Sequence, residues 1–382
     1  EFRRVLFRSE VVREEGDVDG FVAAELGWSV EELGGYLSPE QVDAVALAIN
    51  TLQKGRGFLE ADQTGLGKGR VMAALARYSV LQQKTVVFLT ETPTLFTDFW
   101  RDISDIGSAE LFTPMIVNDG VSIFDPISGN KLVPATPKAV IQAALDGGVV
   151  DPAYNLVLGT YSQFNRDRAK SSKARWISQI AEGKALLLDE AHNAAGESNT
   201  GQNIGLAIDN ADFVVYSSAT AMKAGKNVML YSELFPETVD MGALPETLAI
   251  GGEVLQEVLS GMLARDGVFI RREHDLSNLA FSTVSDDERE ERNRSLSDKL
   301  AEILELMNYL AGDINELVNK RNKEIKKALE AIPEVERKGN RMGAVSTNFG
   351  SRLYAIYRQF MMAIKTDLAA DRAIKALEEG KK

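Results

Sequence analysis

The segment DQTGLGKGR, residues 62–70, decides the fold of this chain. It follows the apolar run GFLE at 57–60 and precedes the helical stretch VMAALARYSVL at 71–81. Glycines in such a loop let backbone N–H groups turn inward around phosphates, and the start of the following helix adds the positive end of its dipole. Lys68 is placed to reach the β and γ phosphates of a nucleotide. Because glycine-rich turns with one lysine also arise by chance, the loop alone only favours a nucleotide site.

The residue after the lysine departs from the usual phosphate-binding loop. That position is commonly Ser or Thr, whose hydroxyl coordinates magnesium, whereas this chain has Gly69. Magnesium readily keeps water ligands, so either a water or the hydroxyl of Thr64 can take the vacant coordination position. We therefore expect ATP and Mg²⁺ to bind despite the missing hydroxyl.

A second motif, DEAH at 189–192, ends the apolar run Ala185–Leu188. A buried parallel strand that ends in two carboxylates can deliver Asp189 to magnesium and Glu190 to the attacking water. An isolated Asp-Glu pair is usually a solvated strand end, but that interpretation explains neither the apolar run nor the loop upstream. The predicted catalytic residues are Lys68, Asp189, Glu190 and His192, with Asp189 as the Mg²⁺ ligand, either directly or through a water.

Short apolar runs alternate with amphipathic stretches from Leu37 to about Ala243, which is typical of strands and crossover helices in a parallel sheet. The runs fall at 57–60, 85–89, 156–158, 185–188 and 213–216. In open α/β sheets, ligands bind outside the carboxyl ends of the strands, so the motifs share one edge. The predicted fold is an α/β, RecA-like P-loop NTPase sheet flanked by helices and followed by a mostly helical extension.

Ser218-Ala219-Thr220 follows the last of these runs. Three small residues can form a simple turn, but the order glycine loop, DEAH and SAT resembles superfamily-2 helicases. In those motors the Ser-Ala-Thr element couples the nucleotide site to the strand-binding cleft, which implies coupling roles for Ser218 and Thr220. Kinases and viral packaging ATPases do not predict this third element.

The same resemblance extends to weaker signals. Gln41 lies upstream of the glycine loop, where such motors use a glutamine to read adenine, although it can equally be a surface helix residue. The resemblance implies nucleic-acid contacts, with DNA favoured, for Thr90, Thr92, Thr160 and Tyr161. The complete set of expected nucleotide-binding residues is Gln41, Thr64, Gly65, Gly67, Lys68, Gly69 and Arg70.

The chain is similar to the strawberry notch family of superfamily-2 helicase-like proteins over Leu37 to about Phe281. That family carries GKGR in place of GKT, so Gly69 is the residue that the resemblance implies. Residues 263–281 resemble its arginine-containing GMY-x-AR-x-LS segment, and 218–227 resemble its SAT element with the following basic turn. Two departures are DEAH in place of the family's usual DECH and the stretch 113–137, which has no counterpart.

The expected domain organisation has four parts. Residues 1–9 contain RRVLFRS, which a common library-adapter sequence encodes, and we expect them to be non-native. Residues 10–36 form a flank, and 37–245 form the nucleotide-binding domain with a surface insertion at 113–137. Residues 246–382 form a helical extension that leads towards a second RecA-like domain, whose arginine-finger motif we do not find. We therefore expect ATP binding with weak or absent hydrolysis.

The extension has apolar residues at helical spacing from Leu300, which predicts one long amphipathic helix ending before Pro333. A break at 339–343 precedes a second helical stretch, 353–377. The first stripe favours packing on a neighbouring helix, with a partner-binding coiled coil as the alternative. Three arginines, Arg265, Arg271 and Arg272, are candidates for domain-interface or strand contacts, with ordinary surface charge as the alternative.

Composition limits the other possibilities. The chain has no cysteine and two histidines among 382 residues, which excludes disulfides, thiolate zinc sites and histidine-rich metal centres. Its formal charge of −13 argues against a surface coated for nucleic-acid binding but leaves local basic patches possible. The sequence contains no apolar stretch of membrane-spanning length. We expect a cytoplasmic protein encoded by a bacterium or phage.

Two functions remain open from the sequence. The first is the ATP-binding half of a nucleic-acid-dependent ATPase or translocase. The second is a non-catalytic regulator that binds nucleotide as a switch and holds a partner through its helical region. ATPase measurements with Lys68 and Glu190 replaced would separate them.

Overall fold

The computed structural model describes residues 11, 14, 16–196, 198–220, 225–236, 238–273, 283–330 and 350–380. The expected adapter-derived segment and the break at 339–343 lie outside these described residues. The chain divides into two compact units, Glu1–Leu276 and Ser277–Lys382.

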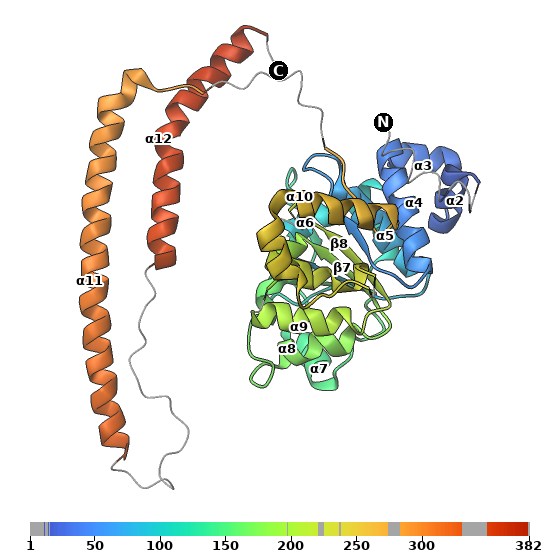
Figure 1. Ribbon diagram of the computed structural model, residues 1–382, viewed down its shortest axis with the longest axis horizontal. Helices are drawn as coiled ribbons and strands as arrows, with labels where there is room; N and C mark the ends of the chain where they lie inside the picture. The colour runs from blue at the N-terminus through green and yellow to red at the C-terminus, as the bar shows by residue number, and fades with distance from the viewer. Residues whose placement is uncertain are drawn as a thin grey trace. The chain divides into compact units, whose positions relative to one another are not determined.

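A parallel sheet forms the centre of the first unit, with β7 and β8 labelled in Figure 1. It has seven strands in the order β3-β6-β2-β7-β8-β1-β9. The strands are β1 (Phe58–Glu60), β2 (Val86–Thr90), β3 (Pro114–Ile116), β6 (Leu156–Thr160), β7 (Ala185–Asp189), β8 (Phe213–Ser217) and β9 (Phe269–Ile270). The five apolar runs predicted from the sequence are β1, β2, β6, β7 and β8. The predicted fold class, a RecA-like parallel sheet flanked by helices, is confirmed.

Helices cover both faces of this sheet. One face carries α2 (Val18–Leu26), α3 (Val30–Tyr36), α4 (Pro39–Gln53), α5 (Lys68–Leu81) and α6 (Leu95–Asp105). The other carries α7 (Lys138–Gly147), α8 (Ser172–Ile180), α9 (Asn199–Ile208) and α10 (Leu244–Arg265). Side chains alternate along β7, so Leu187 packs in the first layer while Leu186 and Leu188 pack in the second. Burial on both faces explains why these strands are continuous apolar runs.

The stretch 113–137 is not wholly a surface insertion. Its first residues form β3, which pairs with β6, and Met115 and Ile116 are fully buried. An antiparallel hairpin follows, with β4 at Ile123–Phe124 and β5 at Lys131–Val133. The expectation failed because a three-residue edge strand is too short to stand out from the surrounding turn residues.

The compact unit also extends beyond both ends of the expected 37–245 domain. In the preceding flank, Val22, Leu26 and Leu33 belong to the core on the α4 and α5 face. Downstream, α10 packs under the sheet and β9 pairs with β1 as an additional parallel strand. The helical spacing of α10 suggested an extension, but its apolar side contributes to the core of the sheet domain.

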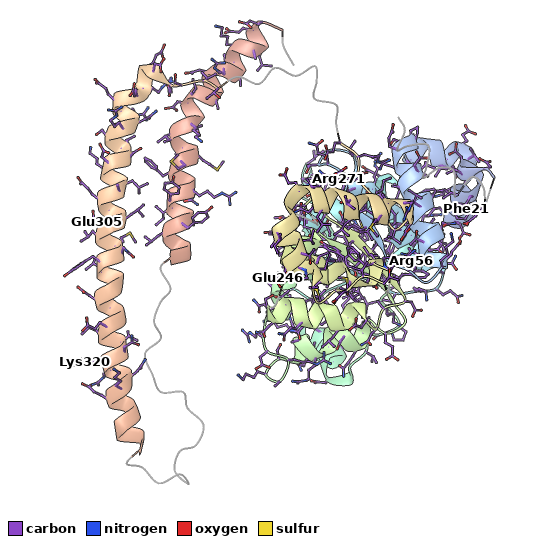
Figure 2. All side chains as sticks on the ribbon, in the orientation of Figure 1. Phe21, Arg56, Glu246, Arg271, Glu305 and Lys320 are labelled. Carbon is purple, nitrogen blue, oxygen red and sulfur yellow. The ribbon has the colours of Figure 1, made fainter. Side chains whose placement is uncertain are left out.

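The second unit consists of two long helices, α11 (Glu290–Glu330) and α12 (Gly350–Glu378). Nη2 of Arg289, just before α11, lies 2.6 Å from Oδ2 of Asp371 in α12, and Nη1 of Arg292 lies 2.9 Å from Oδ2 of Asp367. Figure 2 shows side chains projecting along both helices, with Glu305 and Lys320 labelled on α11. The apolar stripe predicted to pack on a neighbour is largely exposed, as at Leu317, where the exposed fraction is 66%.

None of the described helices combines the length and the apolar character that crossing a membrane demands.

Candidate active site

The phosphate-binding loop connects the carboxyl end of β1 to α5. Gly65 and Gly67 have φ values of +96° and +86°, a left-handed backbone conformation that residues other than glycine rarely adopt. Gly67 caps α5, whose first residue is Lys68. The Lys68 ammonium donates a hydrogen bond of 2.8 Å to the carbonyl of Asp62, so it folds back over its own loop. The loop therefore has the backbone shape that an inward-facing ring of N–H groups requires.

A cavity of about 460 Å³ opens beside this loop. Its lining includes every residue that the sequence predicts for nucleotide binding, namely Gln41, Thr64, Gly65, Gly67, Lys68, Gly69 and Arg70. Asp189 and Glu190, at the end of β7, line the same cavity. Phe88 and Phe99 form part of its wall and stack with ring centroids 3.8 Å apart. The structure thus brings the two sequence motifs to one cavity, although strand β8 separates their strands.

Asp189 lies at the point where β7 leaves the core. Its Oδ2 accepts a hydrogen bond of 2.9 Å from the Thr90 hydroxyl. Burial raises the pKa of Asp189 above its ordinary value, and the Thr90 hydrogen bond opposes that rise. A buried carboxylate with a raised pKa favours a nearby cation, because a positive charge stabilises its ionised form.

Glu190 has a φ of +47°, which is unusual for a residue with a side chain. Such a conformation costs about 1–3 kcal/mol and is found most often at functional sites. The Glu190 carboxylate remains 37% exposed, in contrast to the buried side chains of the preceding strand. Its backbone therefore turns the second acid of the motif out of the strand direction and towards the cavity.

His192 joins the DEAH and SAT motifs. Its Nδ1 lies 2.9 Å from the Ser218 hydroxyl and 3.4 Å from Oε2 of Glu190. The Ser218 oxygen also accepts a hydrogen bond of 3.3 Å from the backbone N–H of Thr220. Ser218 follows β8, the strand between β1 and β7, so the sheet order places the two motifs side by side.

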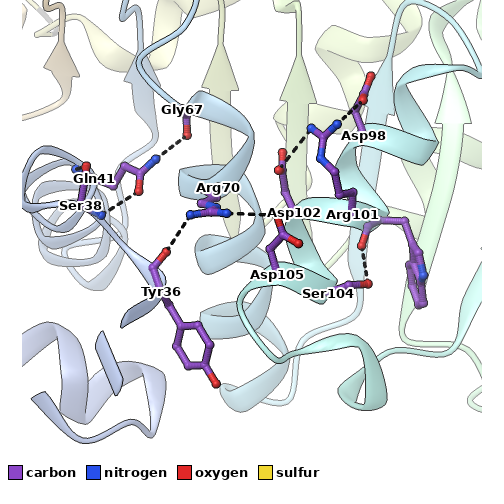
Figure 3. Close-up of polar contacts among 11 residues, drawn as sticks. Tyr36, Ser38, Gln41, Gly67, Arg70, Asp98, Arg101, Asp102, Ser104 and Asp105 are labelled. Atoms are coloured by element: carbon purple, nitrogen blue, oxygen red, sulfur yellow. Dashed lines mark hydrogen bonds and ion pairs between the residues drawn. The ribbon is translucent and has the colours of Figure 1, made fainter. Parts of the chain in front are cut away.

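Gln41 lies against the phosphate loop, not on an open surface. It is the third residue of α4, where its Oε1 accepts a hydrogen bond of 2.9 Å from the backbone N–H of Ser38. Its Nε2 donates to the carbonyl of Gly67 at 3.4 Å (Figure 3). This capping box fixes the start of the helix, and the side chain is only 7% exposed. Gln41 is therefore not an exposed residue on the surface of a helix, which was the alternative interpretation of its position in the sequence.

Three of the four residues expected to contact nucleic acid are buried. Thr90 and Thr160 have no exposed surface, and Tyr161 is 4% exposed. The Tyr161 hydroxyl donates a hydrogen bond of 2.8 Å to the carbonyl of Asp189, and Thr90 bonds the carboxylate of the same residue. The expectation is corrected for these three, because their side chains lie inside the protein: Thr90 and Tyr161 support Asp189, and the Thr160 hydroxyl accepts a hydrogen bond from Asn118. Thr92 is exposed and bonds Thr94.

The three candidate arginines have different surroundings. Arg272 pairs with the fully buried Asp62, with an Nε–Oδ2 distance of 2.9 Å, and its backbone N–H donates to the same carboxylate. Arg271 is exposed on the surface of the unit (Figure 2) and pairs with Glu273. Arg265 is also exposed. Arg272 therefore ties the chain after β9 to the start of the phosphate loop, and surface charge describes the other two.

Helix α6 contributes polar residues that the sequence analysis did not identify. Asp98 and Asp102 line the cavity, and the Arg101 guanidinium donates to both carboxylates at 2.9 and 3.4 Å (Figure 3). Asp105 accepts a hydrogen bond of 3.0 Å from Arg70. The four-residue spacing of the two cavity aspartates, which places them on one side of the helix, was the available signal, but no motif marks it.

Glu60, the last residue of β1, is fully buried, and neither carboxylate oxygen has a hydrogen-bond partner among the described residues. Burial raises the pKa of Glu60 well above its ordinary value of 4.5, and Asp62 adds to that rise, while Arg272 and Lys68 oppose it. At a pH between the ordinary pKa of an unfolded glutamate and the raised pKa of Glu60, the folded state therefore holds a proton that the unfolded state has lost. Stability contributed by this group is lost as the pH rises through that window.

Replacing Glu60 with Gln is expected to remove this pH dependence. Because glutamine stays neutral, the free energy of unfolding of Glu60→Gln should rise relative to the parent protein as the pH increases from about 5 to about 8. Urea unfolding at several pH values, followed by tryptophan fluorescence, measures the difference. Parallel pH curves for parent and variant would contradict the predicted neutral state of Glu60.

Comparison with known proteins places this geometry in a family. The model of the P-loop containing NTP hydrolase pore-1 family matches residues 29–297. No curated protein matches the chain. That family match covers the phosphate loop, the DEAH motif, the SAT element and β9.

Solved structures similar to this chain include two SWI2/SNF2 ATPase cores from Sulfolobus solfataricus. The one in complex with dsDNA has a TM-score of 0.43 and 14% identity, over 86% of this chain and 65% of that chain. The other has a TM-score of 0.42 and 14% identity, over 71% and 52%. The UvsW helicase from Bacteriophage T4 has a TM-score of 0.34 and 20% identity, over 51% and 56%.

The chain spans about half to two thirds of the length of these solved chains. The match to the family model, in contrast, covers more than half of its 382 residues. The chain therefore belongs to the P-loop containing NTP hydrolase pore-1 family.

Proposed function

We propose that this chain binds ATP with Mg²⁺ in the cavity beside the phosphate loop and hydrolyses it as the first half of a superfamily-2 type motor. The observation that carries the proposal is the convergence of Lys68, Asp189 and Glu190 on one 460 Å³ cavity. Lys68 begins the helix after β1, whereas Asp189 and Glu190 lie at the end of β7. The two strands are not neighbours, and the sheet order brings the three side chains together.

The chemistry of the cavity fits a magnesium nucleotide. Gly65 and Gly67 allow the loop to curl, and the fourteen-residue helix α5 directs its positive end at the cavity. Lys68 offers an ammonium group, and Asp189 offers the oxygen that magnesium prefers. When bound, magnesium neutralises negative charge on the phosphates and so assists phosphoryl transfer.

The residues of this chain then have separate roles. Lys68 exchanges its bond with the Asp62 carbonyl for bonds with phosphate oxygens, which are stronger because both partners are charged. Thr90 and Tyr161 fix Asp189 by its carboxylate and its carbonyl. Glu190, which remains partly exposed, orients the attacking water and accepts its proton. His192 connects that acid to Ser218 and so to the SAT element.

Nucleic acid, with DNA favoured, is the proposed track of the motor, and a second RecA-like domain is its proposed partner. The support is the motif order glycine loop, DEAH and SAT, with the last two motifs in contact through His192 and Ser218. The residues GKGR, and Gly69 in particular, favour a strawberry notch-like branch. The test is the rate of ATP hydrolysis by the motor together with its second RecA-like domain, with and without duplex DNA; a rate that DNA leaves unchanged would contradict the coupling.

Replacing Lys68 with Ala is expected to weaken the binding of ATP by about 10- to 100-fold, because charged hydrogen bonds contribute about 1.5–3 kcal/mol each. Fluorescence titration with a labelled ATP analogue in the presence of Mg²⁺ measures the affinity. Lys138→Ala is a matched control, since that lysine is 81% exposed on α7 and pairs with Asp119. Equal affinity in both variants would contradict the proposed site.

A further inference from the structure

Gly69 stands one residue after the phosphate-binding lysine, and its backbone does not require glycine. Unlike Gly65 and Gly67, it does not have a positive φ. An ideal Cβ on residue 69 would lie 2.0 Å from Oδ2 of Asp102 and 3.2 Å from its Cγ. The carboxylate of Asp102 therefore fills the volume that a serine or threonine side chain would occupy after the lysine.

Asp102 reaches this position from α6, which packs beside α5. The hydrophobic side of α6 anchors the helix through Phe99, stacked on Phe88, and through the fully buried Ile103. On the polar side, Nη2 of Arg101 donates to Oδ1 of Asp102 at 3.4 Å (Figure 3). Oδ2 of Asp102 lies against Gly69. The side chain of Asp102 is 15% exposed, so packing and one hydrogen bond hold it in place.

The charge of Asp102 matters because the cavity holds other carboxylates as well as the basic side chains of Lys68, Arg70 and Arg101. Burial raises the pKa of Asp102, and the Arg101 guanidinium opposes the rise. Asp189 and Glu190 line the same cavity. Nucleotide phosphates would add further negative charge, so without a cation a carboxylate beside the phosphate loop repels the ligand. With a magnesium ion present, the same carboxylate attracts the ion.

We propose that Asp102 provides an oxygen ligand, directly or through one water, to the magnesium ion of a bound nucleotide. In other phosphate-binding loops, the hydroxyl of the residue after the lysine provides this ligand. This assignment rests on the proposed function, since the ion arrives with the nucleotide. Within the described residues, no group of three or more acidic, histidine or cysteine side chains forms a metal site. The assignment accordingly gives Asp102 one ligand position and leaves others to phosphate oxygens and water, as is common for magnesium.

A carboxylate carries a negative charge and a hydroxyl does not, and binding measurements with and without Mg²⁺ detect this difference. Removing Asp102 should weaken nucleotide binding when Mg²⁺ is present and leave it equal or stronger when Mg²⁺ is absent. A side chain that only supports the fold would affect both conditions in the same direction. The ratio of the two affinities therefore separates a role towards the ion from a structural role.

The experiment titrates the full chain with a fluorescent ADP analogue, once in Mg²⁺ and once in EDTA. Asp102→Ala and the isosteric Asp102→Asn are expected to reduce the Mg²⁺-dependent gain in affinity by about 10- to 100-fold, the usual effect of losing a group that supports a metal. Gly69→Ser combined with Asp102→Ala should restore part of that gain, because the serine hydroxyl enters the vacated space. Asp119→Asn is the control, since that aspartate pairs with Lys138 and does not line the cavity.

The outcomes distinguish the assignment from the function on which it rests. If the unaltered chain binds the analogue only weakly in both solutions, the proposed nucleotide site fails, and the assignment fails with it. If the unaltered chain binds well and both Asp102 variants keep its Mg²⁺ dependence, only the assignment is overturned. An equal loss in Mg²⁺ and in EDTA for both variants also overturns it, because that is the result of a purely structural role.

Discussion

Replacing Glu190 with Gln is expected to lower the rate of ATP hydrolysis by about 10²- to 10⁴-fold, the range that a positioned general base contributes. Glutamine keeps the size of the side chain but cannot accept the proton of the attacking water. Because Lys68 and Asp189 remain in place, the affinity for ATP should change little. Single-turnover hydrolysis with excess protein measures even a slow rate, and titration with a labelled analogue measures the affinity.

Glu182→Gln provides the control for this prediction. Glu182 is exposed and precedes the amino end of β7, the same strand whose carboxyl end carries Glu190. Its replacement should leave hydrolysis unchanged. Hydrolysis by Glu190→Gln at the rate of the unaltered chain would remove Glu190 from the mechanism, whereas a loss of binding would indicate that the residue supports the site.

Replacing Arg272 with Ala is expected to lower the free energy of unfolding of the first unit by about 3–5 kcal/mol, because it leaves the fully buried Asp62 without its charged partner. Urea unfolding followed by tryptophan fluorescence reports on this unit alone, since all three tryptophans, Trp28, Trp100 and Trp176, lie within it. The phosphate loop begins at Asp62, so nucleotide binding should weaken as well.

The adjacent residue supplies a matched control for this stability change. Arg271 pairs with Glu273 at the surface, where the two side chains are 47% and 59% exposed. Exposed pairs contribute little, and Arg271→Ala should alter the free energy of unfolding by no more than about 0.5 kcal/mol. Equal effects of the two substitutions would show that the Asp62–Arg272 pair is not the buried support described here.

Sequence patterns located the strands and motifs of this chain because both depend on local features. A strand covered on both faces must be apolar at every position, so β2 and β7 stand out as continuous runs. A phosphate loop needs glycines where φ is positive, and Gly65 and Gly67 have such values. Seven expected nucleotide-binding residues consequently line one cavity.

Other features could not be predicted from the sequence, because they depend on contacts between residues that are far apart in the chain. Strand β9 has two residues and is recognisable only by its pairing with β1. Tyr161 was expected to contact a nucleic-acid strand, yet its hydroxyl bonds the carbonyl of Asp189 inside the protein. Arg271 and Arg272 are identical and adjacent in the sequence, but only the second faces a buried carboxylate. Neither composition nor spacing distinguishes such neighbours.

By itself, the sequence determined the parallel-sheet fold, the phosphate loop and the order of the DEAH and SAT motifs, because apolar runs and glycine spacing are properties of short segments. Only the tertiary structure decided which side chains from separate segments meet. It placed Asp102 in the space left by Gly69 and His192 beside Ser218, contacts that depend on helix packing and strand order. Gly69 alone suggests a missing magnesium ligand, whereas the packing of α6 against α5 brings a carboxylate to the same place.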